Sequence, residues 1–155
     1  MRSPVFAIVA PHVSLEGGRR SYASAYRALP PGAAERTVVV LGTSHYGAPE
    51  RFGLTRKPYR TPLGETRVDQ AAVDRLAAAA GATVEVEDYC HAVEHAIEFQ
   101  VLFIQHLLGC QVPVVPVLCG SLNEYLEAGV PMSDIGLVQL TRKRTRPSLD
   151  RTLKR

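Results

Sequence analysis

Three short, almost unbroken apolar runs constrain the fold of this 155-residue sequence more than any other feature. They are "VFAIVA" at 5–10, "TVVVLG" at 37–42 and "VPVVPVLCG" at 112–120. A run this short, without alternation of polar and apolar residues, is typical of a strand buried on both faces. The prolines in the third run predict that its strand is short or lies near a sheet edge.

The segments between these runs have the composition of helices and turns. We expect a loop over 12–20, then a helix over 21–29 with Ser21 as its N-cap, and an irregular excursion or hairpin over 51–67. Further helices are predicted at 68–81, 92–109 and 121–129, and a short strand at 82–87. In the helix at 92–109, the residues at core spacing are Ile97, Val101, Ile104 and Leu108. Strands that alternate with helices predict an α/β fold, with a central, mostly parallel sheet flanked by helices.

Length and charge divide the chain into one domain over residues 1–130 and a divergent basic tail over 131–155. The tail holds seven Lys or Arg and two Asp, a charge of +5, which leaves −2 of the net +3 for the rest. The body therefore lacks the basic surface of a nucleic-acid-binding protein, and the tail lacks interleaved aromatic residues. We expect no nucleic-acid partner.

The cysteines and the first residues bear on the compartment. Three cysteines without a CxxC pair favour a reducing compartment over a disulfide scaffold or a cysteine-rich zinc site. The first apolar run, at 5–10, is too short for a signal peptide or a membrane span. We expect a cytoplasmic protein without a membrane partner.

Two histidines follow directly on the first two predicted strands. His12 comes after "VFAIVAP", and His45 lies in "LGTSHYG" at 41–47, where small and flexible residues allow a sharp turn. In a parallel sheet these two strand ends share one edge, where ligands gather. Two imidazoles on rigid strand ends can bind a divalent transition metal, although a single histidine there is more often an ordinary loop residue.

Besides these two histidines, a cluster of polar residues, "HAVEHAIE", begins at His91. His91, Glu94, His95 and Glu98 have the spacing of one helix face. We expect His91 to belong to a polar helix start and His95 to point inward. Cys119 ends the third apolar run, where a buried, unreactive thiol is a commoner outcome than a ligand or a nucleophile.

Taken together, the motifs resemble the Memo family, also named AmmeMemoRadiSam system protein B. The matching segments are "APH" at 10–12, "LGTSHYG" at 41–47, "YRTPLGE" at 59–65, "EHAIEFQVLFIQ" at 94–105 and "VVPVLCGS" at 114–121. The resemblance implies a fold like the LigB-type class III extradiol dioxygenases, with a cleft at the strand ends. It implies His12 and His45 as metal ligands, and His95 as a third ligand or an acid–base catalyst. It further implies iron or copper as cofactor, and a small molecule or peptide bound in the cleft.

The sequence departs from the family pattern after position 130. Family members are longer, and their later strands supply a cysteine ligand to which Cys119 does not correspond. We therefore expect the C-terminal part of the family fold to be missing. Three readings stay open: a metal-dependent oxidoreductase, a non-catalytic binding or adaptor protein that uses the same cleft, and a truncated inactive copy. Homo-oligomerisation stays open as well.

Overall fold

The structure is a computed structural model that describes residues 5–48 and 51–120. These residues form a four-stranded sheet of order β1-β6-β2-β5, a separate two-stranded hairpin and four α-helices. The elements are α1 (Leu15–Tyr26), η1 (Ala33–Glu35), β1 (Val38–Thr43), β2 (Phe52–Leu54), β3 (Tyr59–Thr61), β4 (Gly64–Thr66), α2 (Gln70–Ala80), η2 (Gly81–Thr83), β5 (Val84–Val86), α3 (Asp88–Val93), α4 (His95–Leu108) and β6 (Val114–Cys119).

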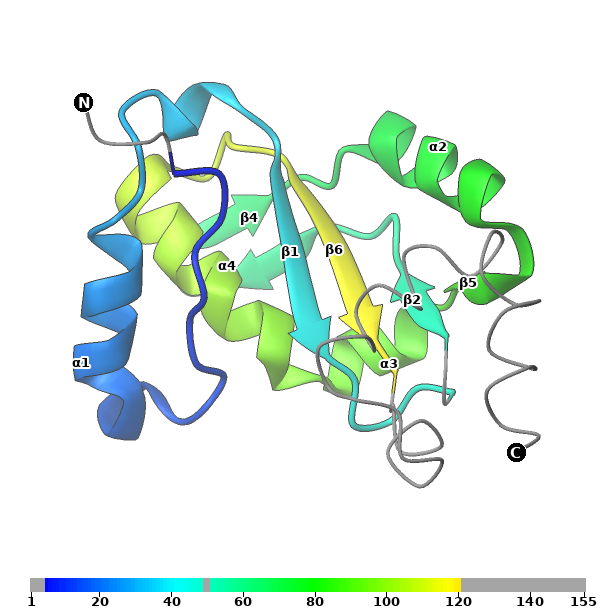
Figure 1. The fold of residues 1–155 in the computed structure, drawn as a ribbon, viewed down its shortest axis with the longest axis horizontal. Helices are drawn as coiled ribbons and strands as arrows, with labels where there is room; N and C mark the ends of the chain where they lie inside the picture. The colour runs from blue at the N-terminus through cyan, green and yellow to red at the C-terminus, as the bar shows by residue number, and fades with distance from the viewer. Residues whose placement is uncertain (1–4, 49–50, 121–155) are drawn as a thin grey trace, which may run out of the picture. The chain divides into compact units, whose positions relative to one another are not determined.

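The predicted α/β class is confirmed, with a mixed, mostly parallel sheet. β1 and β6 run parallel, with Val38 opposite Val114 and Thr43 opposite Cys119. β2 is parallel to β5 and antiparallel to β6. The long strands β1 and β6 therefore end at the same edge of the sheet (Figure 1).

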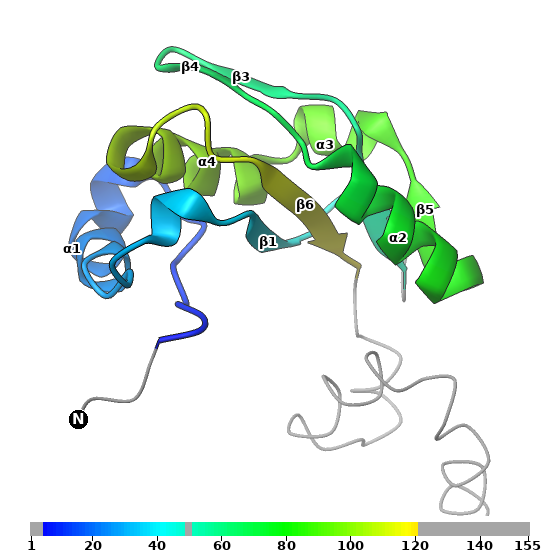
Figure 2. The same ribbon diagram turned by 90° about the horizontal axis from the view of Figure 1, so that it is seen from above.

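Helix α4 covers one face of this sheet and lies between the sheet and the β3–β4 hairpin (Figure 2). Its residues at core spacing are buried as predicted, with Ile97 and Val101 completely inaccessible and Ile104 only 2% exposed. On the hairpin side, Gln105 donates a hydrogen bond to the Gly64 carbonyl at 3.1 Å. Contacts on both sides hold the helix in place, and its first residue with it.

The expected position of the third apolar run was wrong. β6 lies inside the sheet, between β1 and β2, rather than near an edge. Pro116 is tolerated there because the ladder to β2 covers only residues 117–119, so no β2 residue lies opposite the proline.

The expected strand at 5–10 is absent, although its direction is right. The segment follows the direction of β1 without pairing to it (Figure 1). Ile8 and Ala10 line a cavity of about 220 Å³ together with residues of β1, and no ladder joins these two described segments. Phe6 and Val9 are 89% and 94% exposed, which shows that this run is not buried on two faces.

The expected burial of β1 on both faces is also wrong. Val40 and Gly42 face α4 and are buried, whereas Val39 and Leu41 on the opposite face are 58% and 69% exposed. Among the described residues, α4 covers only the face of β1 that carries Val40, so Val39 and Leu41 on the other face gain little burial.

Helix α1 begins earlier than expected. Ser14, rather than Ser21, is the N-cap, and its hydroxyl accepts a hydrogen bond from the Gly17 amide at 3.2 Å. The stretch expected as a loop is therefore mostly helix. Gly18 is required by packing, because a Cβ there would lie 2.6 Å from the Tyr22 ring. That ring stacks in turn on Phe103 of α4, with centroids 4.6 Å apart.

Other local predictions are confirmed. Helix α2 ends at Gly81, β5 forms within 82–87, and the excursion over 51–67 contains the β3–β4 hairpin. Strand β2 in the same stretch was not predicted, because its three residues are too few for a pattern. None of the helices in the described ranges is both long and apolar enough to cross a membrane. The helix expected at 121–129 and the tail over 131–155 lie outside the described residues.

Candidate functional site

Three histidines from distant parts of the chain lie around one point. The ring centroid of His12 is 5.5 Å from that of His45 and 5.8 Å from that of His95, and the latter two are 5.3 Å apart. These distances place the three rings next to one another, while the ligand atoms that lie within 4.8 Å of one another are those of His45, His95 and Glu94. The structure therefore brings together all three histidines singled out in the sequence.

The turn after β1 positions His45. The Ser44 amide still donates to the Cys119 carbonyl at 2.9 Å, which extends the ladder one residue beyond the strand. The Ser44 hydroxyl then accepts a hydrogen bond from the Gly47 amide at 2.9 Å, which closes the turn. His45 lies between these two anchors, so its backbone is fixed relative to the end of β1.

The missing side chain of Gly42 lets α4 approach this turn. A Cβ at Gly42 would lie 2.7 Å from Cγ1 of Ile97 and 3.3 Å from Cβ of Ala96. Both neighbours belong to the first turn of α4, which begins at His95. Glycine at this position therefore sets the spacing between His45 and His95.

The expectation of one helix face from His91 to Glu98 was wrong. The helix is interrupted at Glu94, which has an extended backbone and ends α3 while it caps α4. The Glu94 carboxylate accepts hydrogen bonds from the amides of His95 and Ala96, at 2.9 and 3.2 Å. These bonds satisfy free helix N–H groups and stabilise the break. As a result, His91 and His95 point to different places.

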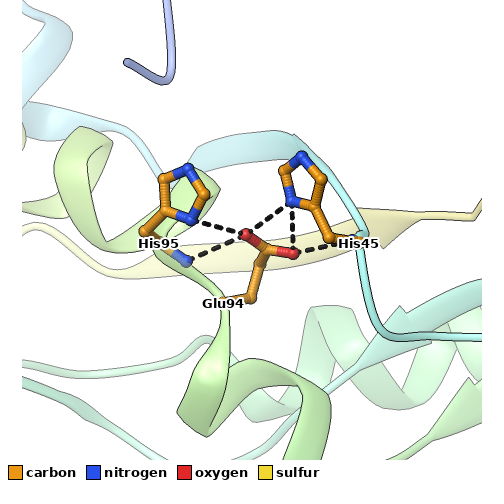
Figure 3. Close-up of side chains that lie close together, drawn as sticks. All are labelled: His45, Glu94 and His95. Carbon is orange, nitrogen blue, oxygen red and sulfur yellow. Dashed lines mark hydrogen bonds and ion pairs between the residues drawn. The ribbon is translucent and has the colours of Figure 1, made fainter. Parts of the chain in front are cut away.

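Glu94 also holds His45, and it is the centre of the site (Figure 3). Its carboxylate accepts from the His45 amide at 2.8 Å and lies 2.9 and 3.0 Å from His45 Nδ1. Nδ1 of His95 lies 3.1 Å from the same carboxylate. Burial raises the pKa of Glu94, but the hydrogen bonds from His45 and Ala96 outweigh it and hold the pKa below the ordinary value.

The outer edges of the two rings stay open. The side chains of His45 and His95 are 42% and 44% exposed, whereas that of Glu94 is only 1% exposed. The rings are almost parallel, with an interplanar angle of 11°. Figure 3 shows both rings extending from the carboxylate in the same direction, away from the body of the fold.

The cavity beside β1 adjoins this cluster. His12 and Thr43 line it together with apolar side chains, among them Ile8, Leu29 and Ile104. The site therefore combines an imidazole cluster with an adjacent hollow lined by both polar and apolar groups, a combination found in small-molecule sites.

His91 and Cys119 do not belong to the cluster. The Tyr59 hydroxyl lies 2.7 Å from His91 Nδ1, and His91 Nε2 donates to the Gly53 carbonyl at 3.0 Å. Burial lowers the pKa of His91, so the ring stays neutral as a packed structural residue. Burial raises the pKa of the Cys119 thiol, which disfavours the thiolate that a nucleophile or a ligand needs.

Sequence reasoning missed the role of Glu94. Its signal was a carboxylate directly before His95 at the start of a strongly apolar helix, but glutamate is not among the preferred N-cap residues. The ligand atoms of His45, Glu94 and His95 lie within 4.8 Å of one another. With His12 close by, the donor set fits iron, copper or another transition metal that binds imidazole.

Comparisons with known proteins agree with this arrangement of motifs. The family model described as "Memo-like protein" matches residues 2–131. A MEMO1 family protein of Methanosarcina acetivorans is 29% identical over 133 residues, which cover 84% of this chain and 48% of the relative. One of Sulfurisphaera tokodaii is 31% identical, over 83% of this chain and 46% of the relative. One of Aquifex aeolicus is 33% identical, over 72% and 29%. The chain thus spans half or less of the length of these relatives. Since the family model matches most of its residues, this chain belongs to the Memo family.

Proposed function

We propose that this protein is a metal-dependent oxidoreductase that holds one iron or copper ion with His12, His45 and His95. The observation that carries the proposal is the arrangement of three imidazoles around one point, with ring centroids 5.3–5.8 Å apart. Three protein ligands leave positions free for a substrate and O₂, as non-haem iron oxygenases require.

The ion would supply binding and one-electron activation of O₂ next to a bound organic substrate. The chain supplies the positions of the ligands: β1 fixes His45, and the capped start of α4 fixes His95. His12 follows a segment tied to α4 by the Gln100 side chain, which donates to the Pro11 carbonyl at 2.9 Å. His95 has an alternative role as an acid–base group, because its ring is 44% exposed beside the cluster.

The cavity beside His12 supports a substrate with an apolar portion. Its described lining mixes apolar side chains such as Ile8, Leu29 and Ile104 with the polar groups of His12, Tyr26, Thr43 and Gln100. An aromatic or aliphatic group placed there would lie next to the histidine cluster. We propose a small organic molecule with such a group as the substrate class.

Metal content tests this proposal directly. Protein purified without oxygen and titrated with Fe(II) or Cu(I) should bind one ion per chain. His12→Ala, His45→Ala and His95→Ala should each lower that stoichiometry or weaken binding at least about tenfold. His106→Ala is the matched control, because His106 is exposed near the far end of α4. A protein that binds neither metal, or three variants that bind as well as the control, would contradict the proposal.

A non-catalytic binding module is the second candidate. The cavity beside His12 favours it, since an apolar side chain of a peptide could occupy that space whether or not a metal is bound. This candidate predicts that His45→Ala preserves partner binding while Ile104→Ala, in the cavity wall, weakens it. Loss of partner binding in His45→Ala would argue for the metal-dependent function instead.

A further inference from the structure

The Glu94 carboxylate takes part in more side-chain hydrogen bonds than any other group of the described residues, and it can act as the acceptor in all of them. Its carboxylate receives hydrogen bonds from the amides of His45, His95 and Ala96 and lies within bonding distance of His45 Nδ1. Every one of these partners can act as an N–H donor. An ionised carboxylate offers about four acceptor positions, so these four donors fill them.

A filled carboxylate is poorly suited to be a metal ligand. To bind an ion, Glu94 would have to give up bonds that cap α4 or hold the His45 turn, and its side chain is only 1% exposed. Proximity alone makes His45, Glu94 and His95 a candidate ligand set. The hydrogen bonds favour another role, because a carboxylate behind a metal-binding histidine commonly accepts from one ring nitrogen while the other nitrogen binds the metal.

We propose that Glu94 is a positioning residue that fixes His45 in the Nδ1–H tautomer, so that it presents an unprotonated Nε2 to the metal. An ionised carboxylate can only accept, so the ring nitrogen facing it carries the proton. His45 Nδ1 lies 2.9 and 3.0 Å from the two carboxylate oxygens, and His95 Nδ1 lies 3.1 Å from one of them. One buried side chain thereby orients the His45 ring and caps the start of α4, where His95 lies.

The consequence for the metal rests on the proposed function, whereas the tautomers do not. In the metal-free protein, the His45 ring should already be in the form that binds. Since neutral imidazole carries its proton on only one nitrogen, a fixed Nδ1–H leaves Nε2 as the sole donor to an ion. The direction in which both rings extend from Glu94 matches this requirement (Figure 3).

Histidine nitrogen NMR of the metal-free chain at about pH 8, where an ordinary histidine with a pKa of about 6.5 is neutral, tests the tautomers. We expect an Nδ1–H signature for His45. His91 is an internal reference of the opposite kind, because its Nε2 faces the Gly53 carbonyl, which can only accept. Mixed or Nε2–H forms of His45 in the unaltered protein would overturn the proposal without any variant.

Glu94→Gln is the informative variant, and Glu98→Gln, on the exposed next turn of α4, is its matched control. The Gln amide places an NH₂ donor against ring or backbone N–H groups, so the His45 tautomer should become mixed. Affinity for Fe(II), measured by anaerobic chelator competition, should fall about 10–100-fold. Glu98→Gln should change neither, and the His91 signal should be the same throughout.

The outcomes separate the two proposals. An unchanged His45 tautomer in Glu94→Gln would overturn the positioning role. If this variant also lost Fe(II) binding completely, Glu94 would be a ligand instead. The expected tautomer without any binding of iron or copper to the unaltered protein would support the positioning role and overturn the oxidoreductase.

Discussion

The close approach between β1 and α4 at Gly42 offers the sharpest test of how this fold builds its site. In Gly42→Ala the new Cβ would lie 2.7 Å from Cγ1 of Ile97 and 3.3 Å from Cβ of Ala96. The first distance is well inside van der Waals contact, and Ile97 is completely buried, so it cannot swing into solvent. Overpacking of this kind costs about 1–3 kcal/mol.

The same overpacking should reach the histidines. Ile97 lies in the first turn of α4, two residues after His95, and Gly42 lies three residues before His45. The strain is relieved most simply if the start of α4 moves away from β1, which separates the two rings. We therefore expect Gly42→Ala to weaken Fe(II) binding by about tenfold, at the low end of what changes to residues that support metal ligands cost.

Urea denaturation followed by circular dichroism measures the change in the free energy of unfolding, since the chain has no Trp for fluorescence. Gly53→Ala is the matched control, because a Cβ there would meet its nearest neighbours at an ordinary 3.5 Å, so its stability should be unchanged or slightly higher. Ile97→Ala alone should cost about 2–5 kcal/mol.

A double-mutant cycle isolates the contact. The methyl group that Gly42→Ala introduces can occupy part of the space left by Ile97→Ala. The double variant should therefore be more stable than the sum of the single changes predicts, by about 0.5–3 kcal/mol. Additive losses, or a Gly42→Ala protein as stable as Gly53→Ala, would refute the reasoning.

Three further predictions concern parts of the fold away from the cluster. Tyr59→Phe removes the hydroxyl partner of buried His91 Nδ1 and should cost about 1–3 kcal/mol in urea denaturation while Fe(II) affinity is unchanged; lost affinity would place His91 in the site. Gly18→Ala should destabilise α1 by about 1–3 kcal/mol because its Cβ would lie 2.6 Å from the Tyr22 ring, and an unchanged melting temperature would contradict that packing. The amide of Ala72 and the hydroxyl of Thr37 lower the pKa of Asp69, the N-cap of α2, below its ordinary value. The contribution of Asp69 to stability is therefore complete above the unfolded pKa and is lost as pH falls through the lower folded pKa. Asp69→Asn keeps a capping acceptor but does not titrate, so the stability of this variant should fall less steeply at acid pH. A variant whose stability falls as steeply as that of the unaltered protein would contradict this prediction.

Local patterns were enough where a single segment determines the outcome. The apolar stripe of α4, the Gly81 end of α2 and the hairpin were all predictable from short-range composition. His45 was predictable as a site residue because it follows the end of β1 in a parallel pair, whereas His12 reaches the cluster without the strand that was expected before it. Each of these inferences needs only periodicity, turn chemistry or chain order.

Other features depend on contacts between segments that the sequence does not pair. Whether "VFAIVA" becomes a strand depends on how closely it approaches β1, and these two described segments line a cavity without a ladder between them. Pro116 can lie inside the sheet only because β2 ends before reaching it. Glu94 leaves the helix because the His45 turn and the start of α4 offer more donors than a continuous helix would.

The sequence by itself determined the α/β class, the main helices and the identity of the three histidines, because these follow from periodicity, chain order and motif. Only the tertiary structure decided that β1 is buried on one face and that a buried glutamate joins two of the histidines. The physical reason is that burial and hydrogen-bond saturation belong to pairs of elements brought together by folding, and the spacing of residues along one segment does not encode them.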